Sequence, residues 1–359
     1  MAKALHCIVW GAGLMGRLLS HSLAQAGHRV QVHDAGDPEG QGSAARIAAS
    51  MLAPLAESAI TEWPVVQMGQ YSLGRWPELI ESLPAPVFFQ QTGSLLLWHR
   101  QDAPQAKSLV DKLFVNSQQL PDDCQPVSIS TEQLQTLEPE LSGKFQQGLW
   151  LPREGQLDNR QLLDALLQSM EQLGVGIHWH SSLNLKEIER LSDSGVDWVF
   201  DCRGTGAKSE WPAVRGVRGE VIRLHAPEVH IQRPVRLMHP RYPLYIAPKP
   251  HGVYVIGATE IESDDSSPAS VRSALELLSA AYSLHSGFAE ARILEINTQR
   301  RPALNHNLPG IRQPSARMVQ INGLYRHGFL VAPAVLDAVM GLVNGELALA
   351  NRFQLLQDV

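Results

Sequence analysis

The stretch HCIVWGAGLMGRLLSHSLAQAGHRVQVHD, residues His6–Asp34, decides the fold of this chain. A short apolar run leads into three glycines spaced G-x-G-x-x-G, which are Gly11, Gly13 and Gly16. In such a turn the first glycine permits the tight bend, and the second lets the backbone approach a diphosphate. The third lets the following helix pack close to the strand. The stretch therefore predicts a strand, a glycine turn, a helix and a second strand, as in a Rossmann-like domain.

Asp34 ends the second predicted strand, eighteen residues after Gly16. A carboxylate at this place can accept hydrogen bonds from the hydroxyls of an adenosine ribose. The N-terminus of the predicted helix offers free N–H groups and the positive end of its dipole to a diphosphate. The pattern indicates the ADP half of a dinucleotide, and it does not distinguish NAD from FAD.

The composition limits what kind of protein this is. With 359 residues the chain predicts about two domains, and 44% hydrophobic with 18% charged residues suffice for full cores. The formal net charge of −6 argues against nucleic acid as a partner. Three cysteines far apart suit a reducing compartment, and neither a secretory signal nor an uncharged run of about 18 residues is visible. We therefore expect a cytoplasmic protein without a membrane span.

Two segments leave more than one interpretation open. The run Ser43–Glu57 is rich in small residues, and it fits either a tightly packed helix start or a second surface against the cofactor with Arg46 near phosphate. His178 and His180 stand two apart on a predicted strand, 175–180, a spacing that metal ligands can use. Because no cysteine, third histidine or suitably spaced acid accompanies them, we predict exposed strand histidines and no metal site.

Later segments extend the Rossmann-like pattern. A second glycine-containing turn follows the apolar run Trp198–Cys202. Near the end, a predicted strand at 318–322 leads through a loop to an apolar helix with Pro333 in its first turn. From Gly219 onward the pattern between these segments is that of an antiparallel sheet. Dinucleotide-binding segments thus lie at the start, middle and end of the chain, with sheet segments inserted between them.

Four stretches make the chain resemble a known family, the D-amino-acid-oxidase superfamily of flavoproteins, and within it the glycine oxidase branch associated with thiamine biosynthesis. They are GAGLMG at 11–16, AASMLAPLAE at 48–57, YIAPKPHGVYVIGATE at 245–260 and GLYRHGFLVAP at 323–333. The resemblance implies FAD as the cofactor, and we expect it to be bound non-covalently because no cysteine lies in the stretch RRPALNHN at 300–307. It also implies oxidation of a small amine or amino acid to an imine, with O2 reduced to hydrogen peroxide.

With this resemblance the fold prediction becomes specific. We expect an α/β protein with an α+β second domain, in which a Rossmann-like FAD-binding domain is intertwined with an antiparallel-sheet substrate domain. The predicted FAD-binding domain comprises 1–82, 146–216 and 302–359. The predicted substrate domain comprises 83–145 and 217–301.

The resemblance also implies roles for single residues. Met51 matches a position beside the isoalloxazine, Tyr245 and Arg301 match the pair that holds the substrate carboxylate, and Arg326 matches an arginine beside flavin and substrate. Strand alternation predicts that only one of Arg301 and its neighbour Arg300 faces the pocket, and of the two the resemblance favours Arg301. The predicted cofactor-binding residues are Gly11, Gly13, Leu14, Met15, Gly16, Asp34, Arg46, Ala48, Ala49, Ser50, Met51, Leu183, Cys202, Gly204, Arg326, His327, Gly328, Phe329 and Leu330.

The chain departs from the family pattern at places that bear on the substrate. The family's loop commonly reads G-H-x-R-N-G. In this chain Leu324 replaces the histidine of that motif and His327 replaces its asparagine, and Ser50 stands where a glycine is usual before Met51. We expect FAD binding to survive these changes, whereas the substrate stays open. The leading prediction is an oxidase of glycine or sarcosine. The alternative is a maturation factor that oxidises a residue of a partner protein during quinone-cofactor biogenesis, and a homo-oligomer is one possible assembly.

Overall fold

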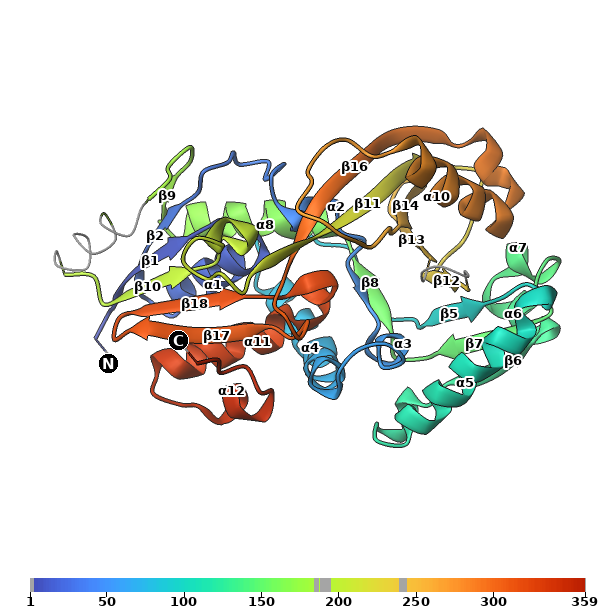
Figure 1. Cartoon of the computed structure of the whole chain (residues 1–359), viewed down its shortest axis with the longest axis horizontal. Helices are drawn as coiled ribbons and strands as arrows, with labels where there is room; N and C mark the ends of the chain where they lie inside the picture. Colours follow the sequence, from blue (N-terminus) through green and yellow to red (C-terminus); the bar gives the residue numbers. More distant parts are fainter. Residues whose placement is uncertain (1–2, 184–186, 188–194, 239–243, 359) are drawn as a thin grey trace.

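The computed structural model describes residues 3–183, 187, 195–238 and 244–358. Its elements form two large sheets that lie side by side along the long axis (Figure 1). Both chain termini lie at the end of the molecule that contains the first of these sheets (Figure 1). This is the mixed α/β architecture that the sequence predicted.

The first sheet has six strands in the order β17-β18-β10-β1-β2-β9. Neighbours from β18 to β9 run parallel, and β17 is an antiparallel edge strand. The central strands are buried and rich in β-branched and aromatic residues, as parallel strands covered on both faces require. The strands are β1 (His6–Trp10), β2 (Arg29–His33), β9 (Gly176–His178), β10 (Trp198–Asp201), β17 (Gly310–Ser315) and β18 (Met318–Asn322).

Helices around this sheet build the largest hydrophobic core. Helix α11 packs on α4 and α1, and α1 packs on α8. Shorter helices lie in the segments between these elements and after α11. These helices are α1 (Leu14–Gln25), α2 (Ala44–Ile47), α3 (Pro54–Glu57), α4 (Trp63–Glu81), α8 (Asn159–Gln172), η3 (Gly204–Ala207), η5 (Tyr325–His327), α11 (Gly328–Val343) and α12 (Ala348–Arg352).

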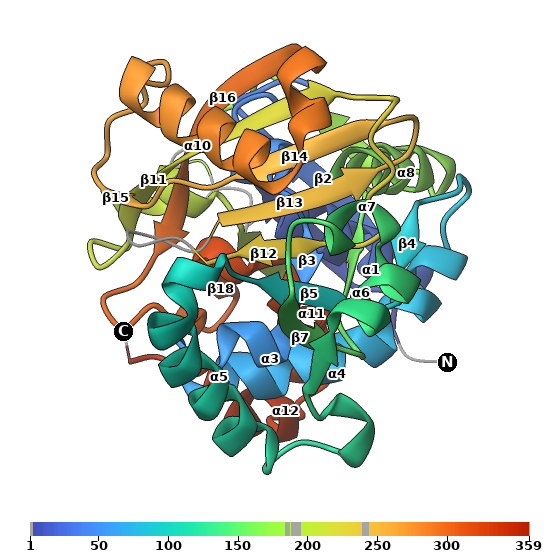
Figure 2. The ribbon, with the colours of Figure 1, turned by 90° about the vertical axis from the view of Figure 1, so that its right-hand side faces the viewer.

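The second sheet has nine strands, and most neighbours are antiparallel. Its path runs β15-β11-β14-β13-β12-β5-β7-β6, and β16 pairs with β11. Figure 2 looks at this sheet, with α10 and α5 on opposite sides of the molecule. The strands are β5 (Ser94–Leu97), β6 (Val127–Ser130), β7 (Gln147–Leu151), β11 (Arg215–His225), β12 (Val235–Leu237), β13 (Leu244–Lys249), β14 (Val253–Gly257), β15 (Ile261–Glu262) and β16 (Arg292–Ala303).

A small three-stranded sheet lies between the two large ones, in the order β3-β8-β4. Its strands are β3 (Met51–Leu52), β4 (Phe89–Gln90) and β8 (Gly155–Leu157). The helices that accompany the nine-stranded sheet are η1 (Arg100–Asp102), α5 (Ala103–Ser117), η2 (Asp122–Cys124), α6 (Thr131–Leu137), α7 (Pro139–Ser142), α10 (Val271–Leu284) and η4 (Ser286–Glu290).

The prediction for the start of the last long helix was wrong. Helix α11 begins at Gly328, so Pro333 lies inside it and not in its first turn. Proline has no N–H group, which leaves the carbonyl of Phe329, four residues earlier, without its helical donor. The indole Nε1 of Trp76 in α4 donates to that carbonyl at 2.9 Å. A contact from a distant helix therefore makes an internal proline acceptable.

The two histidines considered as strand neighbours do not share a strand. β9 ends at His178, and His180 lies beyond it with a left-handed backbone, φ 52°. The ring of His178 stacks on His33 of β2 at 4.5 Å between centroids. Within the residues described, no group of three or more His, Cys, Asp and Glu side chains is placed to hold a metal ion.

Segment 325–343 is long and apolar enough to cross a membrane by length and composition, and it is the one such segment in the described part of the chain. In this fold, 61% of the apolar 18-residue stretch within this segment is buried. Its apolar side chains belong to the core shared with α4 and α1. Its composition is thus that of a core helix.

Candidate active site

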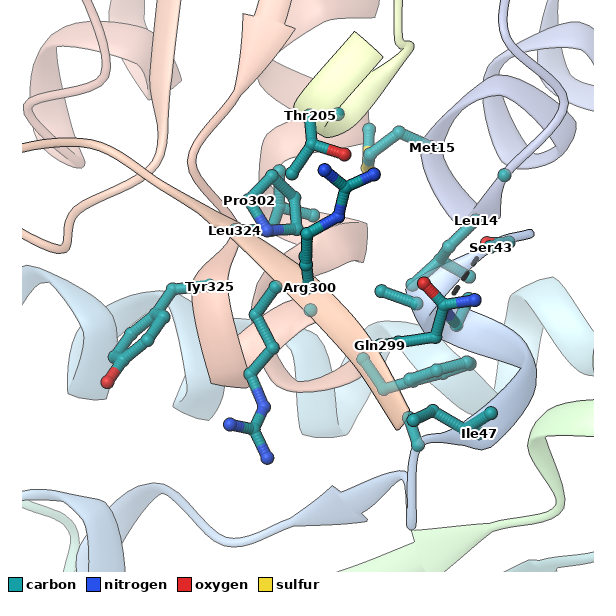
Figure 3. A pocket seen from close by; sticks show the side chains of 18 of the residues that line it. Leu14, Met15, Ser43, Ile47, Thr205, Gln299, Arg300, Pro302, Leu324 and Tyr325 are labelled. Atoms are coloured by element: carbon teal, nitrogen blue, oxygen red, sulfur yellow. Dashed lines mark hydrogen bonds between the residues drawn. The ribbon is translucent and has the colours of Figure 1, made fainter. Parts of the chain in front are cut away.

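A cavity of about 700 Å³ runs from the glycine turn after β1 to the ends of β14 and β16. Figure 3 shows labelled side chains from α1, the 43–47 segment, η3, β16 and the 323–328 loop converging on it. The predicted site residues that line it are Gly11, Gly13, Leu14, Met15, Asp34, Ala48, Ala49, Ser50, Met51, Leu183, Cys202, Gly204, Tyr245, Arg301, Arg326, His327, Gly328, Phe329 and Leu330.

Two predicted cofactor residues do not line this cavity. A Cβ added at Gly16 would lie 1.8 Å from the carbonyl oxygen of Gly11, so this glycine is needed for close packing of helix and turn. The guanidinium of Arg46 pairs with Asp164 at 3.3 Å. Its neighbours Ala45 and Ile47 do line the cavity, and a place for Arg46 near phosphate stays a prediction.

The glycine turn presents backbone donors to the cavity. Gly11 adopts φ 100°, and a Cβ there would lie 2.9 Å from the backbone of Cys202. The N-terminus of α1 has no side-chain cap and no acidic residue in its first turn. Asp34 accepts hydrogen bonds from Ala12 N at 2.5 Å and Gly36 N at 2.6 Å, which fixes its carboxylate beside this helix end. Uncapped N–H groups at a cavity wall suit an anionic diphosphate.

Arg17, one residue beyond the glycine turn, is a structural residue that the sequence analysis missed. It is 2% exposed, and it donates to Ala12 O, Leu163 O and Pro38 O at 2.7–2.9 Å. Burial lowers the pKa of its guanidinium. The side chain thereby joins the turn, α8 and the loop after Asp34. An arginine directly after G-x-G-x-x-G is the signal that would have identified it.

The departure at Ser50 has a backbone explanation. Ser50 adopts φ 49°, a left-handed conformation that glycine takes at lower cost. Its hydroxyl donates to Leu157 O at 2.6 Å, which helps to offset that cost.

Lys249 is a second buried residue at this wall, and the sequence analysis did not predict it. Its Nζ donates to Ala49 O at 2.8 Å and Leu157 O at 2.7 Å, and burial lowers the pKa of its ammonium group to about 7. The side chains of Ser50 and Lys249 both fix the wall formed by 48–51.

Glu57 is the centre of a buried charge network at the opposite end of the cavity. Its oxygens bind Arg236 and Arg326, each at 2.6 Å, and Nδ1 of His327 lies 3.5 Å away. Burial alone would raise the pKa of Glu57, but the two guanidinium groups hold it well below its usual range. Burial lowers the pKa of His327 to about 4, so its imidazole is neutral at pH 7. Glu57 and Arg236 were not among the predicted site residues.

Glu260 continues this network toward the cavity. It accepts a hydrogen bond from the Tyr325 hydroxyl at 2.6 Å and pairs with Arg326 at 2.9 Å. Arg326 therefore bridges the carboxylates of Glu57 and Glu260. Glu260 lies in the GATE stretch that carried the family resemblance, yet the pattern alone gave it no role.

Arg301 differs from the other arginines at this end. Its guanidinium donates to Thr259 O at 3.1 Å, and no ion pair to it is recorded among the described residues. A Cβ at Gly219 would lie 2.2 Å from its Cζ, so glycine on β11 leaves the space that the guanidinium fills. Arg300 lines the cavity as well, but its guanidinium donates to Asp264 O at 3.5 Å.

Tyr245 and Met51 face the same cavity from β13 and β3. Burial raises the pKa of the Tyr245 phenol, which stays protonated at neutral pH. A Cβ at Gly257 would lie 2.6 Å from the Tyr245 hydroxyl, so glycine on β14 leaves space for it. The substrate-end residues predicted from widely separated segments are therefore brought together in one place.

The cavity suits a flavin dinucleotide. Its volume falls within the range of about 300–1,000 Å³ typical of cofactor and ligand sites. The N-terminus of α11 also reaches it through Gly328–Leu330, and that helix, like α1, has no side-chain cap hydrogen bond. Two uncapped helix ends thus offer donors at two places along one cavity, as a diphosphate and an electron-rich ring edge require.

Comparison with known proteins decides the family. The profile of the DAO family, FAD dependent oxidoreductases, matches residues 6–338. The chain belongs to this family. A protein of Rhizobium etli named as the thiamine biosynthesis oxidoreductase ThiO is 36% identical over 335 residues, covering 93% of this chain and 95% of that protein. FAD is thus the cofactor of this oxidoreductase, and the family resemblance drawn from the sequence is confirmed.

Other relatives support the same family and fold. The bifunctional protein ThiO/ThiG of Synechocystis is 25% identical over 354 residues, and this chain spans 51% of its length. Glycine oxidase from Geobacillus kaustophilus superposes with a TM-score of 0.79 at 22% identity, over 96% of both chains. Iminodiacetate oxidase from Chelativorans sp. BNC1 gives 0.79 at 19% identity, over 95% of both. At such identities these two likenesses establish the fold.

Proposed function

We propose that this DAO-family enzyme oxidises a small amine or amino acid of the glycine or sarcosine kind. The substrate would become an imine, and its two electrons would reduce O2 to hydrogen peroxide. The observation that carries the proposal is Arg301, a guanidinium in the cavity without a carboxylate partner among the described residues. The likeness to a ThiO protein and to glycine oxidase supports this substrate class.

The chain's own residues would bind and orient the substrate. Arg301 offers the planar pair of donors that a carboxylate accepts, and the Tyr245 hydroxyl adds a donor from β13 of the same sheet. Met51, at the start of β3, would lie beside the flavin ring. FAD, when bound, supplies the acceptor for the hydride from the substrate Cα. Positioning of the Cα–H bond is then the main contribution of the protein.

The cofactor residues have parallel proposed roles. Gly11, Gly13 and the first turn of α1 would hold the diphosphate, and Asp34 would hold the ribose. The segment 48–51 and the start of α11 would flank the flavin ring. We keep the division into an FAD-binding domain, 1–82, 146–216 and 302–359, and a substrate domain, 83–145 and 217–301, as part of this proposal. Burial raises the pKa of the Cys202 thiol in the cavity, which supports non-covalent binding.

The test uses purified protein and a panel of free amino acids. The protein should be yellow and release FAD into the supernatant on acid precipitation. Under anaerobic conditions glycine or sarcosine should bleach the flavin, and on admission of O2 one hydrogen peroxide should form per substrate. Wild-type protein that retains FAD but reacts with no free amine would overturn the proposal. That result would favour a maturation factor acting on a residue of a partner protein.

A further inference from the structure

Arg301 and Glu260 carry opposite charges in the wall of the cavity at its substrate end. We propose that Glu260 binds the protonated amino group of the substrate while Arg301 binds its carboxylate. Glu260 would then be the residue that selects zwitterionic amino acids over simple carboxylic acids. This inference rests on the proposed function and names the group that recognises the nitrogen.

The other carboxylates of the cavity wall are committed elsewhere. Asp34 is held by backbone N–H groups beside the glycine turn, and Asp37 accepts from Gly40 N at 2.8 Å in the same region. Glu57 is enclosed by two arginines, and 10% of its side chain is exposed. The side chain of Glu260 is 37% exposed. Among the described lining residues, Glu260 is therefore the accessible carboxylate at the substrate end.

The backbone places Glu260 beside Arg301. Thr259, whose carbonyl accepts the hydrogen bond from Arg301, directly precedes Glu260. Tyr325 and Arg326 bind one carboxylate oxygen each, which holds the group in one orientation. Each oxygen still has a lone pair for a further donor. A cation on β16 and an anion in the segment between β14 and β15 match the two charges of a small amino acid.

The surrounding groups keep Glu260 ionised. Burial tends to raise its pKa, but the hydrogen bond from Tyr325 and the charges of Arg326 and Arg301 lower it overall. Tyr325 stays protonated, because burial and the bond to Glu260 raise the pKa of its phenol. The other charged groups in the same network are Glu57 and Arg236, and His327 beside Glu57 is neutral at pH 7. Glu260 is thus an anion across the working pH range.

An anion beside the bound amine has two opposing effects. It strengthens binding of the ammonium form, and it raises the pKa of the amine in the complex. The hydride can leave the Cα only after the amine has lost its proton to solvent. The charge of Glu260 therefore helps to set the pH below which kcat falls, the acidic limb of the plot of kcat against pH. Removing the charge should weaken substrate binding and shift this acidic limb to lower pH.

The experiment compares wild type with Glu260→Gln, which keeps the shape and removes the charge. The dissociation constant of acetate is measured from the change that acetate causes in the flavin spectrum. The dissociation constant of glycine is measured from the dependence of anaerobic flavin reduction on glycine concentration. Glycine should bind about 10- to 100-fold more weakly in the variant, as expected for loss of a charge-assisted bond. Acetate, which has no amine, should bind equally well or more tightly because a nearby negative charge is gone.

Glu262→Gln is the matched control. Glu262 lies two residues away on β15, where it is exposed and pairs with Arg215, and its variant should leave both constants unchanged. If Glu260→Gln does not retain FAD, Glu260→Met provides an uncharged side chain of similar length. Equal weakening of glycine and acetate, or an unshifted acidic limb of kcat, would overturn the inference. The proposed function itself fails only if wild-type protein does not react with glycine, sarcosine or another free amine.

Discussion

The two ends of the cavity are lined by different kinds of chemical group. At the glycine-turn end the wall is mostly backbone, with Gly11, Gly13 and an uncapped helix N-terminus, and Asp34 is held by amide donors. At the other end the wall is a network of side-chain charges centred on Glu57 and Glu260. The groups at the first end belong to the backbone, so few single substitutions can remove them. Each charge at the second end belongs to one side chain, so a single substitution can remove it.

The largest effect is expected for Glu57→Ala, at the charged end. Removing one member of a buried ionic group leaves Arg236 and Arg326 without their shared carboxylate. Such losses typically cost about 3–5 kcal/mol. The free energy of unfolding, measured by urea denaturation at equal FAD occupancy, should fall by that amount. Glu62→Ala, at an exposed site before α4, is the control. A loss no greater than in the control would mean that the network does not support the fold.

The second prediction concerns the substrate-binding charge. Arg301→Ala should lower kcat/KM for glycine or sarcosine by about two to three orders of magnitude, since a buried charge pair is broken in the complex. FAD content should remain normal, because Arg301 is assigned to the substrate. Arg300→Ala, on the same strand, should change kcat/KM by less than about tenfold. Equal losses in both variants would contradict the distinction between the two arginines.

A smaller effect is expected at the backbone-built end. Asp34→Ala should weaken FAD binding by about 1–3 kcal/mol through loss of hydrogen bonds to the ribose and to the turn. The quantity to measure is the dissociation constant of FAD in reconstitution of the apoprotein. Asp111→Ala, in an exposed pair with Lys107, serves as control. Unaltered FAD affinity in the Asp34 variant would show that the glycine-turn end has been misassigned.

The smallest effect should be found at Ser50, where the wall passes from one end of the cavity to the other. Ser50→Gly relieves the left-handed backbone but loses the bond to Leu157 O, so stability should change by less than about 1 kcal/mol. Ser50→Ala loses the bond and keeps the strain. The glycine variant should therefore melt at a higher temperature than the alanine variant. The reverse order would mean that the backbone conformation at Ser50 is not what constrains this position.

The sequence alone determined the backbone-built end, because local rules fix it. Three glycines at set spacing, an apolar strand before them and an amphipathic helix after them specify the turn without distant partners. The parallel sheet, the glycine oxidase-like family and FAD followed from such motifs, and comparison with known proteins bears them out. The start of α11 did not follow, since Pro333 is tolerated inside the helix only because Trp76 donates to Phe329 O.

Only the tertiary structure decided the charged end. Glu57 meets Arg236, 179 positions away, and Arg326, 269 positions away, and Lys249 meets Ala49 across 200 positions. Nothing near these residues in sequence indicates whether they are solvated or paired, because the energy of a charge depends on burial and on its partner. A glycine turn carries its constraint within its own backbone. A buried charge acquires its role only when the fold brings its partners to it.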